Sequence, residues 1–246
     1  MYKMAKLTLS SKSTDFKTWL EPPITLGSCK HYEIAFLSLH TYNSLPNITE
    51  ANNKFKYSSD KGNTWKTITF PKGAYEFDEI NVMIQREMRT NQQMTDEQYY
   101  INIDYFKPTF KTILDISNEE YMVDFGIENS IGSTLGFANE KLSHGIHQSP
   151  NIIDIEKVNS ILVHCDIALG SYVNSRGSNV IHSFSPRVSP GYKVLERPSP
   201  ELIFLPIVER PDIQSIRLWL TDQDNNPIDL MGERITIDIL IREKIN

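Results

Sequence analysis

A strict alternation near the C-terminus is the feature that most constrains the fold of this chain. Four isoleucines alternate there with mostly polar residues, in the order Arg234, Ile235, Thr236, Ile237, Asp238, Ile239, Leu240, Ile241 and Arg242. Successive side chains of a β-strand point to opposite faces, so this period of two predicts a strand with one buried and one exposed face. The same period occurs at Ile216, Leu218 and Leu220, and the turn-forming sequence TDQDNNP separates the two runs. The C-terminal segment is therefore predicted to be a β-meander.

Apolar runs elsewhere predict further strands. Residues 32–42 and 158–165 are apolar on both faces, which is typical of strands in the middle of a sandwich. Residues 201–208 are also apolar, but Pro206 cannot donate a hydrogen bond to a neighbouring strand and indicates an edge or a bulge. Weaker strand patterns lie at residues 6–10, 180–184 and 192–195. Short strands separated by proline-rich spacers favour a β-sandwich over a helical or a βαβ fold.

The middle of the chain has a different pattern. A hairpin is predicted for residues 55–70, around a turn at residues 60–63. Asp78 is then predicted to cap a helix. The apolar stripe of this helix consists of Ile80, Met83, Ile84 and Met88. The strands predicted after the helix are residues 99–106 and 110–116, on either side of Lys107-Pro108. We therefore expect an inserted β-β-α-β-β module.

Together these patterns predict an all-β fold with one helix. We expect an antiparallel β-sandwich that the inserted module interrupts. The expected boundaries are residues 1–53 and 150–246 for the sandwich, 54–137 for the inserted hairpin–helix–strand module, and 138–149 for a loop. A structure in which strands of residues 54–137 were woven through the sandwich sheets would contradict this arrangement.

Composition bounds the class of protein. The 246 residues suffice for one large β domain or two modest ones, and 39% hydrophobic with 23% charged residues indicate a folded core. A net charge of −6 argues against a protein that coats nucleic acid through charge alone. Two cysteines, Cys29 and Cys165, make no disulfide framework and suit a reducing compartment.

The N-terminal sequence bears on location and partners. It lacks the apolar core of a signal peptide, and no apolar run of the chain reaches the ~20 residues of a membrane helix. We therefore expect a protein without a membrane span that is made in the cytoplasm or nucleus and is not secreted. The first seventeen residues contain Lys3, Lys6, Lys12 and Lys17 against one acidic residue, Asp15. This basic arm is able to contact nucleic acid phosphates or an acidic partner, although a solvated terminus is the simpler explanation.

Histidines in the middle of the chain give little support to a metal site. His144 and His147 are three residues apart, with Glu156 downstream. A metal site needs a third ligand at a defined geometry, and the polar, proline-containing surroundings favour surface histidines instead. No CxxC motif and no cysteine–histidine ligand cluster occurs in the sequence.

A cysteine nucleophile is also poorly supported. His164 and Cys165 are adjacent, so on a strand their side chains point to opposite faces and form no nucleophile–base pair. Pairing of Cys165 with the distant His40 or His182 has no support in the spacing. A buried structural cysteine is the favoured interpretation.

Carboxylates and aromatic residues are numerous, but the sequence does not pair them. A glycosidase needs two carboxylates across a cleft, and a stacking site for sugars or bases needs exposed aromatic rings. The candidate carboxylates are Asp104, Asp115, Asp124, Asp154, Asp166, Asp222, Asp224 and Asp229. The candidate aromatic residues are Trp65, Tyr99, Tyr100, Tyr105 and Trp219. The glycines of residues 126–137 lack the lysine of a P-loop and the spacing of a dinucleotide fingerprint. We therefore assign no catalytic, cofactor-binding or metal-binding residue.

Four stretches of the chain, taken in order, resemble one known family. They are residues 18–48, 70–81, 121–137 and 216–243. In these stretches the chain resembles the minor capsid, or penton, proteins of Polinton/Maverick elements and related adintoviruses. The resemblance implies a single jelly-roll subunit of the virion capsid that forms homopentamers at icosahedral vertices, next to a double jelly-roll major capsid protein. It implies no catalytic residue, cofactor or small-molecule substrate.

The resemblance agrees with the strand pattern. A jelly roll has two four-stranded antiparallel sheets. Residues 6–10 and 32–42 are expected to supply two strands, and the segment after Asn151 about six. The expected function is a structural capsid protein without enzymatic activity. Two alternatives remain open: a carbohydrate- or receptor-binding β-sandwich with exposed aromatic rings and carboxylates in one concave patch, and a hydrolase with two carboxylates or a Cys–His pair in a cleft.

Overall fold

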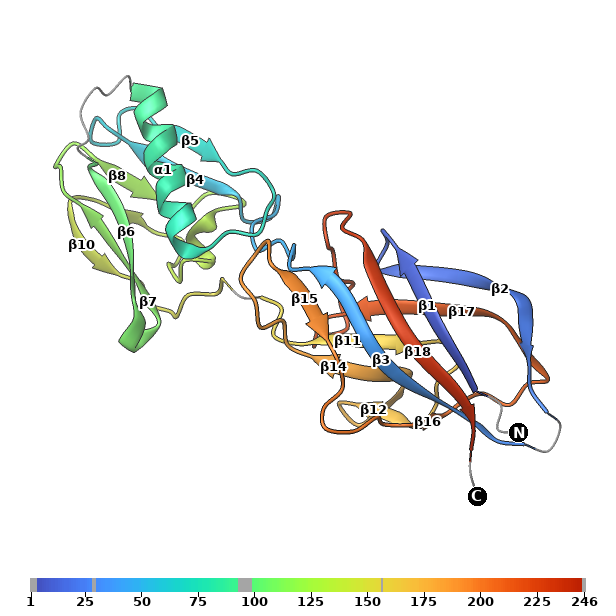
Figure 1. Ribbon diagram of the computed structural model, residues 1–246. Helices are drawn as coiled ribbons and strands as arrows, with labels where there is room; N and C mark the ends of the chain where they lie inside the picture. The colour runs from blue at the N-terminus through green and yellow to red at the C-terminus, as the bar shows by residue number, and fades with distance from the viewer. Residues whose placement is uncertain (1–3, 28–29, 93–98, 156, 245–246) are drawn as a thin grey trace. The chain divides into compact units, whose positions relative to one another are not determined.

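The computed structural model describes residues 4–27, 30–92, 99–155 and 157–244 (Figure 1). The chain divides into two compact units. The sandwich unit consists of Met1–Leu45 and Val158–Asn246, and the insert unit consists of Pro46–Lys157. No helix in the described ranges is long and apolar enough to span a membrane.

Two antiparallel sheets form the sandwich unit (Figure 1). Sheet 1 consists, in order, of β1 (Met4–Ser11), β18 (Ile235–Glu243), β3 (Tyr32–Tyr42) and β15 (Lys193–Glu196), with β16 (Leu205–Pro206) also paired to β3. Sheet 2 consists of β14 (Val180–Phe184), β11 (Ile161–Cys165), β17 (Asp212–Thr221) and β2 (Asp15–Thr25). A separate hairpin is formed by β12 (Ser171–Val173) and β13 (Arg176–Ser178).

The strand pairing is that of a jelly roll. β1 pairs with β18, β2 with β17, β3 with β15 and β11 with β14, so the eight strands form four nested antiparallel pairs. Two further pairings, β3 with β18 and β11 with β17, join these pairs into sheets. A long ribbon of paired strands that folds onto itself gives the two four-stranded sheets of a jelly roll. The predicted antiparallel jelly-roll sandwich is therefore confirmed.

The strands are distributed along the chain differently from the prediction. Three of the eight precede the insert unit and five follow it, instead of two and six. The strand absent from the prediction is β2, where Pro22 and Pro23 interrupt the pattern. An edge strand tolerates proline because its outward N–H groups have no partner strand, and β2 is the edge of sheet 2. The strand predicted for residues 201–208 is reduced to the two residues of β16.

Apolar residues between the two sheets form the core of the sandwich unit. The four isoleucines of the alternating stretch are at most 2% exposed and face the core as predicted. β3 buries three consecutive residues, Ile34, Ala35 and Phe36, in agreement with its place inside sheet 1. Each fully buried large apolar side chain contributes about 1.5–3 kcal/mol to folding, so this core is the main source of stability of the sandwich unit.

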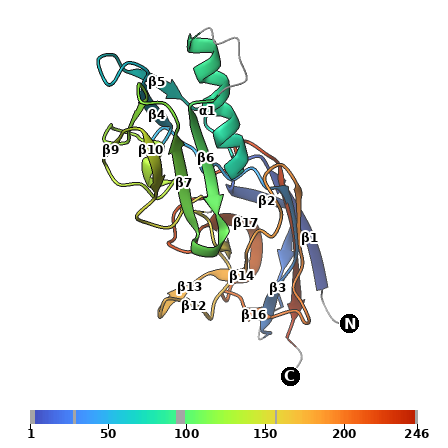
Figure 2. The same ribbon diagram turned by 90° about the vertical axis from the view of Figure 1, so that its left-hand side faces the viewer.

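The insert unit has its own sheets and its own core (Figure 1). One sheet consists of β5 (Lys66–Thr69), β4 (Lys54–Ser58), β8 (Met122–Asp124) and β9 (Lys141–Leu142). The other consists of β10 (Gly145–Gln148), β7 (Lys111–Ile116) and β6 (Ile101–Phe106). The helices are α1 (Phe77–Gln92), η1 (Lys107–Thr109) and η2 (Ile131–Ser133). Figure 2 shows α1 running beside β6. Among the described residues, no strand of the insert unit pairs with a strand of the sandwich unit.

The insert unit extends beyond the predicted residues 54–137 at both ends. Ile48 is fully buried in its core, and Leu142 and Ile155 pack against the same core from the C-terminal side. Residues 138–149, predicted as a loop, contribute the strands β9 and β10. The added segments belong to this unit because their apolar side chains pack into its core.

Helix α1 begins two residues earlier than the sequence indicated. Asp78 was expected to cap it, but the helix already includes Phe77. The backbone N–H of Glu76 donates to the Glu79 carboxylate at 2.8 Å, which is one half of a capping box. Asp78 lies in the first turn, where a negative charge is favourable. In the predicted apolar stripe, Ile80, Ile84 and Met88 are buried and Met83 is partly buried.

Candidate functional site

The histidines considered for a metal site are not assembled into one. Within the described ranges, no group of three or more His, Cys, Asp or Glu side chains is arranged to hold a metal ion. His144 is exposed in the bend between β9 and β10, and the ring of His147 contacts the carbonyl oxygen of Ser143 at 2.7 Å. Glu156 lies outside the described residues.

The adjacent His164 and Cys165 have separate environments on β11. Cys165 is fully buried in the core of the sandwich unit, and burial raises the pKa of its thiol to about 12. Such a thiol is protonated and unreactive at neutral pH, as expected of a structural cysteine. The His164 ring stacks on Trp219 at 4.9 Å, and its Nε2 lies 2.9 Å from Thr221 Oγ1. Burial lowers the pKa of His164.

The distant histidines considered as partners of Cys165 have other contacts. Nε2 of His182 lies 2.9 Å from Oε1 of Glu196. Nε2 of His40 lies 3.3 Å from the hydroxyl oxygen of Ser38. Both histidines are therefore engaged by other side chains, and these contacts do not favour a nucleophile–base pair with Cys165.

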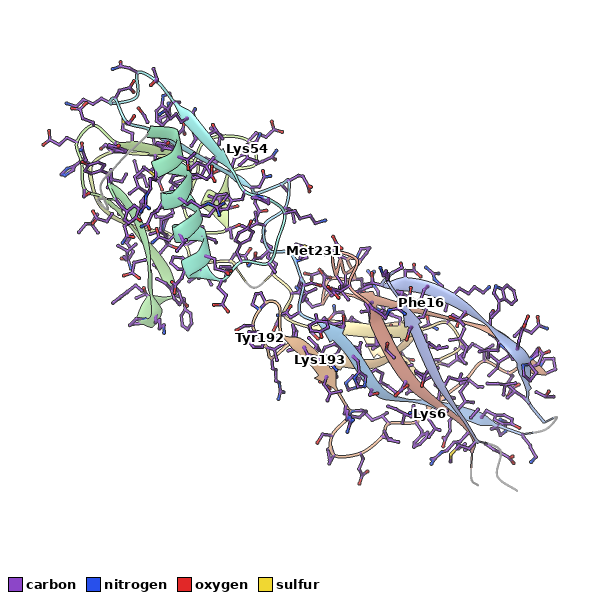
Figure 3. All side chains as sticks on the ribbon, turned by 45° about the horizontal axis from the view of Figure 1, so that its top comes forward. Lys6, Phe16, Lys54, Tyr192, Lys193 and Met231 are labelled. Carbon is purple, nitrogen blue, oxygen red and sulfur yellow. The ribbon has the colours of Figure 1, made fainter. Side chains whose placement is uncertain are left out.

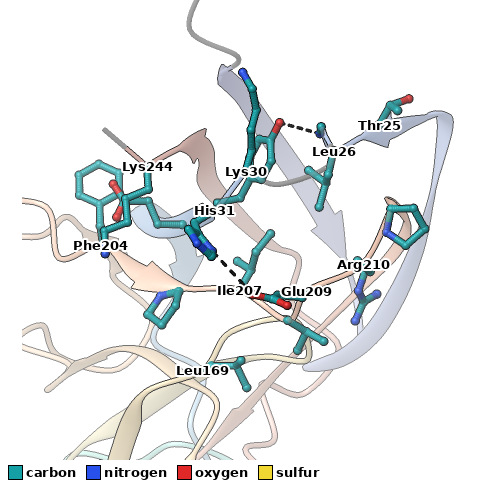
Figure 4. A pocket seen from close by; sticks show the side chains of 16 residues that line it. Thr25, Leu26, Lys30, His31, Leu169, Phe204, Ile207, Glu209, Arg210 and Lys244 are labelled. Atoms are coloured by element: carbon teal, nitrogen blue, oxygen red, sulfur yellow. Dashed lines mark hydrogen bonds and ion pairs between the residues drawn. The ribbon is translucent and has the colours of Figure 1, made fainter. Parts of the chain in front are cut away.

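A cleft of about 1120 Å³ opens in the sandwich unit where β2 ends and β3 begins (Figure 4). Its apolar lining comprises Leu26, Tyr32, Leu169, Phe204, Ile207 and Val208. Two carboxylates also line it, and each faces a basic group. Arg242 Nε donates to Glu33 at 2.6 Å, and Nδ1 of His31 lies 3.6 Å from Glu209. Carboxylates engaged in this way do not favour the acid–nucleophile pair that a glycosidase needs.

Charged and aromatic side chains project from the outer face of sheet 2. They define the tryptophan face: Asp15, Lys17 and Trp19 of β2 with Arg217 and Trp219 of β17. In the strand register, Arg217 lies opposite Lys17, and Trp219 lies opposite Asp15. Trp19 is 66% exposed, although tryptophan is largely buried in most proteins. An exposed tryptophan among charged residues is typical of an interaction surface.

Cation–π contacts and one ion pair order the tryptophan face. The Lys17 ammonium lies 4.8 Å from the centre of the Trp19 ring, and the Arg217 guanidinium lies 5.0 Å from that of Trp219. Arg217 donates to both carboxylate oxygens of Asp15, at 2.8 Å from Nε and 2.6 Å from Nη2. The hydrogen bonds from Arg217 lower the pKa of Asp15. The face therefore combines fixed charges with flat apolar rings, which suits non-covalent contact.

A second group of exposed large apolar side chains lies at the edge of sheet 1 that β15 forms. This tyrosine patch consists of Tyr42, Tyr192 and Leu195, which are 48%, 67% and 52% exposed. Tyr42 lies opposite Lys193 across the β3–β15 pair, and the backbone N–H of Asn43 donates to the Tyr192 carbonyl at 2.8 Å. Figure 3 shows Tyr192 and Lys193 side by side where β15 begins. Tyr42 belongs to β3 and Leu195 to β15, and Tyr192 directly precedes β15, so the patch follows the pairing of these two strands.

Neither surface was predicted from the sequence. Trp219 was a candidate aromatic residue but Trp19 was not, because β2 was not predicted as a strand. The usable signal was the alternation within β2, where Phe16 and Leu20 pack against the core while Lys17 and Trp19 face outward. The tyrosine patch has no comparable signal, because it depends on the pairing of β3 with β15.

Comparisons with known proteins show likeness in structure alone. No family model matches the chain, and no curated protein matches it. The crystal structure of the mavirus penton protein aligns with 98% of this chain and 100% of its own length, at 12% identity and a TM-score of 0.51. The chain has the fold of the mavirus penton protein. A cryo-EM structure of the Sputnik virophage aligns at 12% identity over 98% of both chains, with a TM-score of 0.47.

The candidate aromatic residues of the insert unit make structural contacts within that unit. Trp65 packs under two lysine ammonium groups, Lys56 at 4.8 Å and Lys141 at 5.4 Å from the ring centre. The other pairs are Tyr100 with Tyr121, Tyr105 with Phe77, and Tyr99 with Arg89. Each of these rings has its own partner, so they do not form one stacking platform for a sugar or a base.

The candidate carboxylates are mainly surface groups. Asp124 is buried, and it accepts hydrogen bonds from the Lys56 ammonium and the Gly126 N–H, both at 3.0 Å. Burial opposes its ionisation, but these hydrogen bonds outweigh burial and hold the pKa of Asp124 below its usual value. Asp166 and Asp222 accept backbone N–H groups and stabilise local structure. Asp104, Asp154, Asp224 and Asp229 are exposed, and Asp115 is partly exposed.

The basic N-terminal segment forms strands of the sandwich rather than a loose arm. Lys6 lies on β1, 3.3 Å from Asp238, and Lys17 lies on β2. Lys12 is exposed between these strands, and Lys3 lies outside the described residues. The pairing of Lys6 within sheet 1 leaves less positive charge for contact with a phosphate.

Proposed function

We propose that this protein is a penton subunit. In this proposal it is a structural capsid protein without enzymatic activity, which forms homopentamers at capsid vertices and contacts a double jelly-roll major capsid protein. The observation that carries the proposal is the likeness to the mavirus penton protein over 98% of this chain, which includes both units. The resemblance of residues 18–48, 70–81, 121–137 and 216–243 to Polinton/Maverick and adintovirus pentons supports the same assignment. The proposed location is the virion capsid, after synthesis in the cytoplasm or nucleus of the host.

The surfaces of the sandwich unit support this proposal. A capsid subunit works through shape and contact, and its contacts draw their free energy from apolar burial and complementarity. Aromatic residues and arginine commonly dominate the centres of such contacts. The tryptophan face and the tyrosine patch place such residues on two outer surfaces of the jelly roll.

The environments of the candidate catalytic groups also support a structural role. The Cys165 thiol is buried, and the His182 ring is held by Glu196. The two carboxylates of the cleft, Glu33 and Glu209, each face a basic side chain. Each of these groups is buried or engaged by another side chain, which agrees with a protein whose activity is assembly.

Size analysis of the purified protein tests the proposal. We expect mass photometry to detect a species of five times the 28.3 kDa subunit mass, and negative-stain images to show five-fold rings. The control is the same measurement across a dilution series, because a specific ring dissociates into subunits with a defined midpoint. A protein that stays monomeric at its highest soluble concentration and converts a substrate would contradict the proposal.

Carbohydrate binding is the second candidate function, and one observation favours it. The exposed Trp19 ring lies on the same face as the charged groups of Asp15 and Arg217, and sugars stack on such rings while they hydrogen-bond to neighbouring charged groups. A glycan array with the wild-type protein and the Trp19→Ala variant tests this function. Binding that the variant loses would support it, and a wild-type protein that binds no glycan would reject it.

A further inference from the structure

We infer that the tryptophan face of one copy docks against the tyrosine patch of the next copy, so that the sandwich units join head to tail into a closed ring. The inference rests on the proposed penton function and deepens it, because it names the two surfaces that meet. Both surfaces belong to the sandwich unit, and each contains a large side chain that is more than half exposed, Trp19 on one and Tyr192 on the other.

The two surfaces lie at opposite edges of the sandwich unit. The tryptophan face belongs to sheet 2 and is centred on its edge strand β2. The tyrosine patch belongs to sheet 1 and lies at β15, the edge strand beside the C-terminal half of β3. Glu196 of β15 contacts His182 of β14, so β15 lies over the edge of sheet 2 that is distant from β2. Figure 1 shows β2 and β15 on opposite sides of the sandwich unit.

This placement selects the type of assembly. A two-fold dimer brings one surface against its own copy, whereas a heterologous contact joins two different surfaces and closes a ring when its rotation is repeated. Surfaces at opposite edges of one unit are accessible to two neighbours at the same time. In a closed ring of copies every copy uses both surfaces. The exposed aromatic side chains of the two surfaces are therefore all covered.

The two surfaces are chemically complementary. The tryptophan face presents the Trp19 indole and the Lys17 ammonium, and the tyrosine patch presents two phenol rings and Leu195. Aromatic rings attract one another in offset or edge-to-face arrangements, and an ammonium group is attracted to the face of a tyrosine ring. The contact removes from water the side chains of Trp19, Tyr42, Tyr192 and Leu195, which are 48–67% exposed in the single chain.

The distribution of charge favours a second copy at the sandwich unit. Residues 46–157 contain 11 basic and 17 acidic residues, a net charge of −6, whereas the remaining residues contain 14 of each. Copies of the insert unit therefore repel one another, while copies of the sandwich unit carry no net charge. A neighbouring copy is better accommodated by the two sandwich surfaces than by the insert unit.

Charge substitutions on each surface test the inference. Trp19→Asp and Leu195→Asp each introduce a carboxylate at an exposed position, so both variants should fold, which circular dichroism and thermal melting verify. We expect each variant to be monomeric by mass photometry at a concentration where the wild-type protein is pentameric, and Tyr192→Asp to behave in the same way. The matched control is Ile146→Asp, because Ile146 on β10 is 75% exposed and lies outside both surfaces. This control should remain pentameric.

A mixture of the Trp19→Asp and Leu195→Asp proteins tests the head-to-tail pairing. The first keeps the tyrosine patch and the second keeps the tryptophan face, so the mixture should form dimers through one intact contact and no ring. The inference would be overturned if the variants remained pentameric, or if the mixture stayed monomeric while the wild-type protein was pentameric. These results would leave the proposed pentameric assembly standing. A wild-type protein that never forms pentamers would overturn the proposed assembly itself, and the inference with it.

Discussion

His182 of β14 and Glu196 of β15 connect the two sheets of the jelly roll, with 2.9 Å between Nε2 of the histidine and Oε1 of the glutamate. The ring of Phe36 stacks on His182 at 4.3 Å, and the two polar side chains are 17% and 27% exposed. Both strands are at the edges of their sheets, where backbone hydrogen bonds do not join one sheet to the other. This contact therefore closes the sandwich along one side.

Replacement of His182 by alanine should destabilise the sandwich unit by about 1–3 kcal/mol, because Glu196 loses its partner in a partly buried site and Phe36 loses a stacked ring. Chemical denaturation measures this loss. The control is Glu209→Ala, which removes the His31–Glu209 pair, whose side chains are 67% and 87% exposed. The control should change the free energy of unfolding by less than about 0.5 kcal/mol, and equal effects of the two variants would refute the role of His182.

Protonation of Asp238 should lower the stability of the sandwich unit in acid. Burial opposes its ionisation, but hydrogen bonds from Thr8, Ser38 and Lys6 outweigh burial and hold the pKa of Asp238 below its usual value of 3.8. A carboxyl group whose pKa is lower in the folded state stabilises the fold above its unfolded pKa, and this contribution is lost as the pH falls through the folded pKa.

The variant Asp238→Asn tests this pH dependence. We expect the wild-type protein to lose more of its free energy of unfolding below pH 3.8 than the variant does, because asparagine does not titrate. Denaturation midpoints measured at several acidic pH values, and at neutral pH as the reference, give the two curves. Parallel curves for the two proteins would show that Asp238 does not contribute to the acid sensitivity.

Gly136 of the insert unit should tolerate no side chain. Its φ is +82°, and a Cβ atom there would lie 2.4 Å from the carbonyl oxygen of Asn151. Because that oxygen belongs to the backbone, the strand connection itself has to shift. Gly136→Ala should therefore lower the free energy of unfolding of the insert unit by more than the about 1–2 kcal/mol that the left-handed backbone conformation alone costs. The melting temperature of the unit should fall accordingly.

Gly62→Ala is the matched control for Gly136→Ala. Gly62 belongs to the same unit and has a φ of +86°, but the nearest atom to its Cβ position is the Met122 sulfur at 3.4 Å. This variant reports the cost of the backbone conformation without a steric clash. If both variants shifted the unfolding transition equally in differential scanning calorimetry, the predicted clash with Asn151 would be ruled out.

Cys165 should resist alkylation in the folded protein. Its side chain is fully buried, and burial raises the pKa of the thiol to about 12, so both access and the reactive thiolate are lacking. Treatment with iodoacetamide, followed by mass spectrometry of the peptide that contains Cys165, measures the rate. The unfolded protein serves as the control and should react rapidly. Equally fast labelling before and after unfolding would contradict the buried position.

Periodicity made the core strands and the helix predictable from the sequence. The alternating isoleucines of β18 and the apolar run of β3 are buried as expected, because each pattern follows from the backbone geometry of a single element. β2 was not predicted because Pro22 and Pro23 interrupt it and its inward residues are only partly buried. The exposure of Trp19 was therefore not predicted either, since the outward face of a strand is defined only once the strand is recognised.

The sequence by itself determined that β3, β17 and β18 are strands and that α1 is a helix, and which face of β17, β18 and α1 turns inward, because these properties depend on residues a few positions apart. Only the tertiary structure decided which strands pair, and with them the two exposed surfaces and the contact between His182 and Glu196. Thr8 and Asp238 share a hydrogen bond although they are 230 positions apart. The free energy that selects such partners comes from packing of the whole core, so a local pattern of residues does not predict them.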